Sequence, residues 1–407
     1  MINEIAKIPN ILLPKVKDFA KWSVVACDQF TSQLDYWQQL ASFVGSEPST
    51  LNVIYPEVYL GKEQETRIKN INQTMQNYLD GNLFEQVNDL IFVDRTLNNG
   101  MHRLGLMLCI DLEQYDYTPQ NNALIKATEK TVVERLPVRI EIRKNACLEL
   151  PHVMLLVDDV NKTIIEPLAN ETQNMQVLYN FDLNMNGGHI SGYRVDNSKM
   201  VLQKLIALAD VDVMQKKYGT TQQMLFAVGD GNHSLATAKE CWNLIKKGLT
   251  PQQIATHPAR YSLCELVNLH DNSLVFEPIH RVVFNGGEAF VTAMKSALKG
   301  TGKTKIVYNN KETEINISSN ASVAINEIQQ FIDEYSKNNK IELDYIHGAK
   351  HLLKVANEGN GVAIFMPTLQ KSELFGYVLK NGVYTRKSFS MGEAEDKRYY
   401  LETRKIK

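Results

Sequence analysis

The chain has 407 residues, of which 44% are hydrophobic and 22% are charged, and its formal net charge is −2. This length and composition are typical of a globular protein of two or three domains. The near-neutral charge gives no support for a general nucleic-acid or membrane-surface binder, so we expect neither a nucleic acid nor a membrane among its partners. No apolar run approaches the ~20 residues that cross a bilayer. The five cysteines include no Cys-x-x-Cys pair and the start lacks signal-peptide features, which together favour the cytoplasm.

The first 125 residues predict an N-terminal α/β region. Residues 22–26 and 104–112 are strand-like, and the polar but periodic stretch 64–78 predicts a helix.

Residues 126–285 are expected to form the core. Apolar residues at 138, 140 and 142 alternate with charged ones, which predicts a strand with one charged face carrying Arg139 and Arg143. Arginines such as Arg135 and Arg139 suit a phosphate or carboxylate, but a solvated face paired with nearby glutamates is the alternative. A strand over 152–157, a hairpin partner over 162–167 and a helix over 200–209 follow.

A tight turn between a strand and a helix is the main candidate for chemistry. An apolar run over 224–228 predicts a buried strand, and 235–247 predicts a helix closed by Gly248. The start of such a helix favours an anion, because unpaired N–H groups and the helix dipole act together. Phosphate contacts are therefore predicted for the residues of the turn: Gly229, Gly231, Asn232 and Ser234.

Asp230 and His233 are the candidate catalytic residues of this turn. Asp230 is suited to hold a metal ion or take a proton from a hydroxyl group, and His233 to contact a phosphate. The alternative is a plain turn in which Asp230 or Asn232 only caps the helix.

A smaller α/β subdomain is expected over 286–380, followed by a C-terminal loop and helix over 381–407 that pack back on the core. Its predicted helices are 290–298, 321–336 and 350–356, and its predicted strands are 305–308, 341–346 and 361–366. Ser390 and Glu393 have the spacing of a capping box, which predicts a helix over 390–407.

Further basic residues lie in two segments that could reach a phosphate. His280 and Arg281 follow an apolar run, and Arg386 and Lys387 lie in a polar stretch; a surface loop is the alternative for each. His347 and His351 are four residues apart, but Gly348 argues against a helical metal pair, and we expect no dedicated metal site. The P-loop, dinucleotide-binding and hydrolase-elbow motifs do not occur.

Several segments together resemble a large, mostly bacterial group, the domain-of-unknown-function family 1015. The matching segments are 22–30, 127–129, 149–152, 230–233, 276–283 and 386–394. The family's turn, Asp-Gly-His-His-Arg, is similar to that of the ParB and sulfiredoxin-like superfamily, whose members bind nucleotide phosphates at a helix start. Some members, such as archaeal free-serine kinases, phosphorylate a small hydroxyl substrate.

Carried over to this chain, the resemblance implies roles for Asp230, Gly231 and His233. Asn232 and Ser234 depart from the family's His and Arg, and loss of that Arg removes a bidentate phosphate clamp. Replacement clamps for phosphate or substrate are then expected among other residues: Glu129, Arg135, Arg139, His280, Arg281, Arg386 and Lys387.

The sequence thus predicts an α/β (mixed α+β) protein with a ParB/sulfiredoxin-like core. The leading hypothesis is a cytoplasmic phosphotransferase that uses ATP or another nucleotide with Mg²⁺. A non-catalytic module that binds a nucleotide or phosphometabolite is the first alternative. A hydrolase with His233 as general base is the second.

Overall fold

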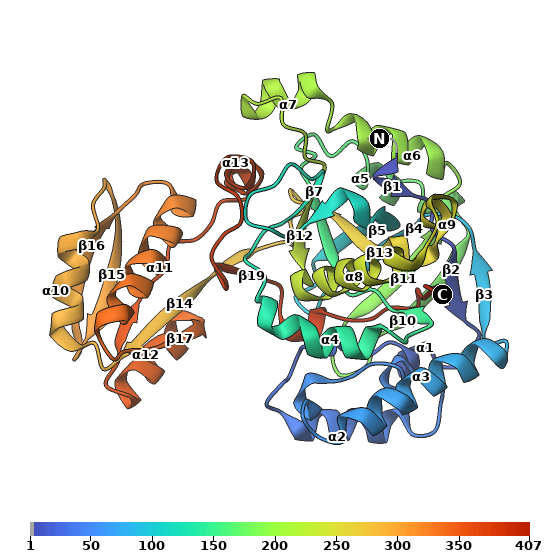
Figure 1. Ribbon diagram of the computed structural model, residues 1–407, viewed down its shortest axis with the longest axis horizontal. Helices are drawn as coiled ribbons and strands as arrows, with labels where there is room; N and C mark the ends of the chain where they lie inside the picture. The colour runs from blue at the N-terminus through green and yellow to red at the C-terminus, as the bar shows by residue number, and fades with distance from the viewer. Residues whose placement is uncertain (1–3) are drawn as a thin grey trace. The chain divides into compact units, whose positions relative to one another are not determined.

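The computed structural model describes residues 4–407, apart from the side chain of Arg135. The chain forms two compact units. Unit 1 comprises the chain up to Ala127, Thr131–Leu274 and Gly392–Lys407, and unit 2 comprises Thr128–Lys130 and Val275–Met391. Both units combine helices with sheets, so the predicted mixed α/β class is confirmed (Figure 1). The division into four segments and the likeness to a ParB-type core stay predictions.

Unit 1 is built on a mixed sheet with the strand order β10-β11-β4-β5-β13-β9-β12-β7-β6, and β1 pairs with β5. Its strands are β1 (Ala6–Lys7), β4 (Ile91–Thr96), β5 (His102–Asp111), β6 (Tyr115–Asp116), β7 (Ile125–Ala127), β9 (Met154–Val157), β10 (Val177–Asp182), β11 (His189–Arg194), β12 (Phe226–Asp230) and β13 (Tyr261–Asn268). Two short ladders accompany this sheet: β2 (Ile11–Pro14) with β3 (Phe84–Val87), and β8 (Leu148–Glu149) with β20 (Arg404–Lys405).

Strand β9 and the first three residues of β12 are continuous apolar runs, as is typical of strands that are buried on both faces. β9 is parallel to β13 and antiparallel to β12, and β12 is parallel to β7 on its other side. Strand partners on both sides therefore fix the end of β12, where Asp230 lies.

The helices of unit 1 are α1 (Phe19–Trp22), α2 (Leu34–Val44), α3 (Gln64–Asp80), α4 (Leu136–Arg143), α5 (Glu166–Ala169), α6 (Ser198–Ala207), α7 (Val211–Tyr218), α8 (Asn232–Ile245) and α9 (Pro251–Thr256). The helices predicted near 64–78, 200–209 and 235–247 are confirmed as α3, α6 and α8. Leu235, Ala238 and Trp242 lie at the spacing of one helical face and bury that face of α8 in the core.

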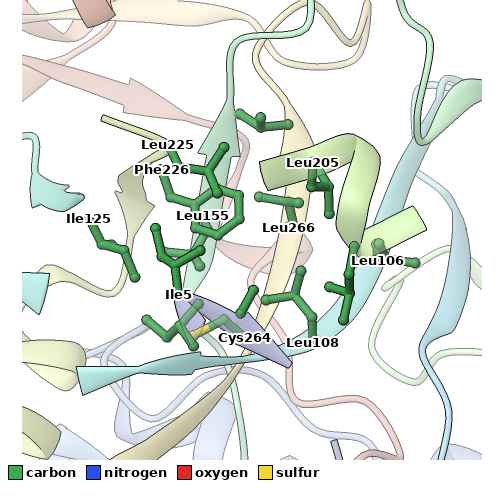
Figure 2. Packing of buried hydrophobic residues seen from close by; sticks show 14 of the residues in the cluster. Ile5, Leu106, Leu108, Ile125, Leu155, Leu205, Leu225, Phe226, Cys264 and Leu266 are labelled. Atoms are coloured by element: carbon green, nitrogen blue, oxygen red, sulfur yellow. The ribbon is translucent and has the colours of Figure 1, made fainter. Parts of the chain in front are cut away.

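The core of unit 1 packs side chains of the sheet against these helices. Figure 2 shows Leu155 and Leu266 from adjacent strands beside Phe226 of β12 and Leu205 of α6. All four side chains are fully buried. Burial of a side chain of this size stabilises the folded state by about 1.5–3 kcal/mol, so the core holds β12 and α8 in place.

Two strands predicted for this region are absent from the structure. The alternating segment 138–143 forms helix α4, because Pro137 favours a first helical turn and the segment packs on α8 instead of joining a ladder. Residues 162–167 form no hairpin. Their chain turns where the Asp159 carboxylate accepts the N–H groups of Thr163 and Ile164, and it then enters α5.

Predictions for the two ends of the chain also need correction. A strand is predicted over 22–26, but residue 22 ends helix α1, which begins at residue 19 and is capped by Asp18. The residues that follow form no strand, and Val25 makes one isolated bridge with Arg398. The expected C-terminal helix is an extended segment with a short 3₁₀ turn over Ala394–Asp396. This segment forms a β-bridge with Leu12 and a short ladder with β8. These pairings outweigh the local capping signal.

Unit 2 contains a six-stranded antiparallel sheet in the order β16-β15-β18-β14-β17, with β19 paired to the start of β14. Its strands are β14 (Phe276–Phe284), β15 (Gly302–Tyr308), β16 (Lys311–Ile317), β17 (Glu342–His347), β18 (Val362–Ile364) and β19 (Phe389–Met391). Its helices are α10 (Gly287–Ala297), α11 (Ala321–Asn338), α12 (Ala349–Glu358) and α13 (Lys371–Asn381). The predicted alternation of helices and strands over 286–380 is confirmed.

Across residues 4–407, none of the helices has both the length and the apolar character that crossing a membrane requires.

Candidate functional site

The candidate site begins where β12 ends and α8 begins. A bulge between Val228 and Asp230 interrupts the pairing with β9, so the strand bends at Gly229. Gly231 follows with φ +79°, and a Cβ on it would lie 3.0 Å from the Cα of Val153. Only glycine fits both this left-handed backbone and this close approach. The predicted turn from strand to helix is confirmed.

The first turn of α8 points its backbone N–H groups back along the chain. The first four N–H groups of any helix lack acceptors within that helix, and here the first bond inside the turn is from Leu235 N–H to the Gly231 carbonyl, at 3.0 Å. Together with the helix dipole, these groups make the start of α8 attractive to an anion.

Asp230 faces a lysine from the C-terminal segment. Its Oδ2 lies 3.1 Å from Lys397 Nζ, and its Oδ1 accepts the Gly231 N–H at 2.8 Å. Both side chains are about a quarter exposed, at 27% and 22%. The carboxylate is therefore fixed in position but still accessible to a ligand.

A histidine and a second aspartate, His152 and Asp28, also belong to the candidate site. His152 Nε2 lies 2.9 Å from Ser234 Oγ. Burial alone would raise the pKa of Asp28, but His152 and Lys397 near it, together with the Gln29 amide, hold the pKa of this carboxyl below its usual value. Lys397 therefore interacts electrostatically with two carboxylates, those of Asp28 and Asp230.

A small cavity of about 20 Å³ lies beside Asp230. Its lining is rich in charged side chains of both signs and includes Arg103, Arg398, Lys397, Asp230, Glu265 and Asp396, with His152 and Tyr400. The Glu265 side chain lies against the backbone of Gly105 on the neighbouring strand β5, where a Cβ would be only 2.5 Å from the Glu265 Oε1 atom.

The buried charges of this lining are incompletely hydrogen-bonded. Within the described residues, Arg103 Nε, Arg398 Nε and Glu265 Oε1 are buried and have no hydrogen-bond partner. Burial lowers the pKa of Arg398 to about 10. Burial also opposes the charge of Arg103, but the nearby Tyr400 and Glu265 raise the pKa of Arg103 above its usual value. Unsatisfied buried polar atoms are rare, and at a cavity they are suited to bind a polar ligand.

The other predicted residues of the turn have defined contacts. His233 Nε2 accepts the backbone N–H of Val132 at 3.2 Å, and its carbonyl accepts the Thr237 hydroxyl at 2.7 Å. The Asn232 Oδ1 atom is buried and has no partner among the residues that the structure describes.

The predicted clamp residues lie in both units. In unit 1, Arg139 lies on α4 and forms an ion pair with Glu57, while the side chain of Arg135 is outside the described part of the chain. In unit 2, Glu129, Arg281, Arg386 and Lys387 lie near one another, and His280 Nδ1 accepts the Met366 N–H at 3.0 Å.

Within residues 4–407, no three His, Cys, Asp or Glu side chains gather closely enough to hold a metal ion. His347 lies at the end of β17 and pairs with Glu277, whereas His351 lies in α12.

Sequence reasoning missed the side chains that surround Asp230. Lys397 and Arg398 fall within the segment predicted as a C-terminal helix, and Arg103 directly precedes the strand predicted over 104–112. A partial signal existed, because Asp28 and His152 lie in segments that carry the family resemblance. The structure joins the first of these segments to Lys397, because the Ala26 N–H donates to the Lys397 carbonyl at 2.8 Å.

Comparison with solved structures finds only distant similarity. A free serine kinase in complex with AMP has 12% identity and a TM-score of 0.38, and the match covers 74% of this chain and 91% of that one. A mutant of such a kinase in complex with ADP has 12% identity and a TM-score of 0.40, with 74% and 92% covered. A C-terminally truncated SbnI from Staphylococcus aureus has 8% identity and a TM-score of 0.37, with 73% and 81% covered.

Among curated proteins, no match to this sequence is found. The family model described as "protein of unknown function (DUF1015)" matches residues 10–404, which is nearly the whole chain. The predicted family resemblance is thereby confirmed, and the protein belongs to the DUF1015 family.

Proposed function

We propose that this protein is a cytoplasmic phosphotransferase that binds a nucleotide with its phosphates at the start of α8. The observation that carries the proposal is the position of Asp230. It ends a buried strand, precedes the first turn of α8 and lines a cavity together with three basic side chains. Phosphoryl transfer depends mainly on positioning and on neutralisation of charge, and a carboxylate, a helix start and cations are the groups that it uses.

In this proposal the phosphates are held by the backbone and by a lysine. The N–H groups of the first turn of α8 donate to phosphate oxygens, and Lys397 neutralises part of the charge. Ser234 cannot form the two parallel bonds of an arginine. Lysine binds phosphate as a point charge, so Lys397 supplies the cation without the directionality of a guanidinium.

Asp230 is the proposed general base. It takes the proton of a small acceptor hydroxyl, whose oxygen forms the new bond to phosphorus. A bound nucleotide would supply the phosphoryl group, and its bond to the departing nucleoside diphosphate would break. The ion pair with Lys397 orients the Asp230 carboxylate for this step.

Mg²⁺ fits the oxygen donors of this turn. Mg²⁺ prefers oxygen ligands and is usually held by one or two carboxylates together with substrate phosphates. Asn232 Oδ1 is a buried acceptor that has no partner among residues 4–407. We propose that it would hold a nucleotide-bound Mg²⁺ together with the phosphates, while Asp230 keeps the role of base.

The alternatives use the same turn. A binding module without catalysis would hold the nucleotide in the same way. A hydrolase with His233 as general base is less favoured, because the Nε2 lone pair of His233 already accepts the Val132 N–H.

Calorimetric titration with ATP, ADP and CTP in the presence of Mg²⁺ tests the binding step. The parent protein is expected to bind at least one nucleotide. Lys397→Gln is expected to bind it about tenfold more weakly, because a phosphate contact is lost. Lys246→Gln is the matched control: it removes the same charge from a residue near the other end of α8, where Lys246 pairs with Glu113. Absence of binding by the parent protein would refute the proposal.

Turnover separates the enzyme from the binding module. With nucleotide and a mixture of small hydroxyl compounds, the parent protein is expected to form a phosphorylated product and Asp230→Asn to lose at least about 100-fold in rate. Nucleotide binding by Asp230→Asn shows that the site remains folded. Binding by the parent protein without any product over hours would favour the binding module.

A further inference from the structure

Unit 2 gathers three cations around one tyrosine ring. Tyr345 lies on β17 directly opposite Arg281 of β14. The Arg281 guanidinium carbon lies 4.4 Å from the centroid of the Tyr345 ring, that of Arg386 5.1 Å and Lys387 Nζ 5.3 Å. Arg386 Nε also donates to the Tyr345 hydroxyl at 2.9 Å. The negative face of an aromatic ring attracts a cation, but three cations near one ring also repel one another.

Arg281 is the buried member of the three cations. Its side chain is fully buried, and its Nε donates to Gln329 of α11 at 2.9 Å. Within the described residues, its Nη2 atom is buried and has no hydrogen-bond partner. The carboxylates of Glu129 and Asp333 favour the charged form of this arginine and raise its pKa. Burial and the neighbouring Arg386 outweigh them and lower the pKa to about 10. The guanidinium is therefore only partly compensated.

The loop that carries Arg386 and Lys387 is held in place by the partly buried carboxylate of Glu129. Glu129 accepts the N–H of Lys387 at 3.1 Å and that of Ser388 at 2.8 Å. The Ser388 hydroxyl donates to the Thr385 carbonyl at 2.6 Å and closes the loop. Lys387 has a φ of +53°, an unusual conformation for a residue other than glycine.

This arrangement differs from a solvated basic surface. The backbone of the loop is fixed, and Arg386 and Lys387 are exposed, whereas Arg281 at the same ring is buried. Because the Glu129 carboxylate already accepts two loop N–H groups, it is not free to pair fully with the cations above it. An oxyanion would satisfy the exposed cations and reduce their repulsion, since guanidinium and ammonium groups both bind phosphate.

We propose that Arg386 and Lys387, with the buried Arg281 at the same tyrosine ring, form an oxyanion site in unit 2 that binds a phosphate group of a small molecule. Arg386 and Lys387 contact the phosphate, and Arg281 adds positive charge from the interior. The proposal does not depend on the function proposed for the start of α8.

Chemical modification with a residue-specific readout tests this site in the full-length protein. Acetylation of lysines and phenylglyoxal modification of arginines are followed by peptide mass spectrometry, with pyrophosphate or with sodium chloride at equal ionic strength. Pyrophosphate is expected to slow modification of Lys387 and Arg386 in a saturable manner, by about tenfold once nine-tenths of the sites are occupied. Lys303, an exposed lysine of unit 2 paired with Glu314, is expected to react at an unchanged rate.

Variants complete the test. Arg386→Gln is expected to raise the pyrophosphate concentration for half-protection of Lys387 by about tenfold. Lys305→Gln, which removes an exposed charge elsewhere in unit 2, should leave it unchanged. Lys397→Gln, which weakens the site proposed at α8, should also leave it unchanged. Absence of saturable protection, equal protection of Lys303, or loss of protection in Lys397→Gln would overturn the proposal.

Discussion

At the scale of single residues, the candidate site is marked by charged groups that the fold buries without full compensation. Arg103, Arg398 and Glu265 each keep at least one buried polar atom without a hydrogen-bond partner in the described part of the chain. Such atoms cost free energy in a folded protein, typically about 1–3 kcal/mol each. Their gathering beside Asp230 is the strongest residue-level reason to place ligand binding there.

Gly231 provides a stability test of the turn. Gly231→Ala is expected to lower the free energy of unfolding by about 3 kcal/mol, because an alanine there meets both the positive φ and the backbone of Val153. Gly219→Ala is the control: Gly219 has φ +70° but nothing within 4 Å of a built Cβ, so about 1 kcal/mol is expected. Denaturant unfolding measures both changes. Equal losses would show that the contact with Val153 has no energetic role.

Glu402 predicts a pH dependence of stability. Burial raises its pKa to about 7, from an ordinary value of 4.5. Between these values the unfolded chain ionises while the folded chain keeps the proton, so rising pH destabilises the fold, and the effect is complete above pH 7.

Glu402→Gln cannot ionise and can still accept the Tyr179 hydroxyl. Between pH 4.5 and 8 the parent protein should therefore lose about 3 kcal/mol relative to this variant. Unfolding curves at several pH values measure the difference, and parallel pH profiles would contradict the assignment.

At the scale of elements, local patterns succeeded where one element dominates and failed where partners decide. The apolar runs of β5 and β12 and the amphipathic pattern of α8 match their predicted types. The segment 138–143 alternates like a strand but has no neighbouring strand to pair with, so it forms α4. The C-terminal segment has a helix-capping pattern, but Arg398 and Arg404 find their partners only when the chain is extended. Such long-range pairing leaves no periodic signal in the sequence.

The pairing of β20 with β8 anchors the C-terminal segment, and a buried ion pair lies in this ladder. Arg404 Nε donates to Glu149 at 2.7 Å, and both side chains are almost fully buried. Arg404→Leu is expected to cost about 3 kcal/mol or more, because it removes a partner of a buried carboxylate.

Lys303→Ala breaks an exposed pair with Glu314 and is expected to change stability by less than about 1 kcal/mol. Thermal unfolding of the two variants compares these effects. A similarly small effect of Arg404→Leu would show that the buried pair does not anchor the segment.

At the scale of the whole molecule, the sequence was sufficient to predict the mixed α/β class, the family and the turn around Asp230. It was not sufficient to predict the surroundings of that turn. Asp28, His152 and Lys397 are far apart in the chain, and only the folded sheet brings them together. Arg281 and Arg386, predicted as clamps, lie around Tyr345 in unit 2. Motif spacing therefore located the turn, whereas tertiary contacts determine its chemistry.

The most direct test of the central claim is a crystal structure of the full-length protein with ADP and Mg²⁺. We expect the phosphates to lie within hydrogen-bonding distance of the N–H groups of Asn232, His233 and Ser234, with Lys397 beside them. Nucleotide phosphates bound elsewhere, or an empty α8 start at a saturating ADP concentration, would contradict this claim.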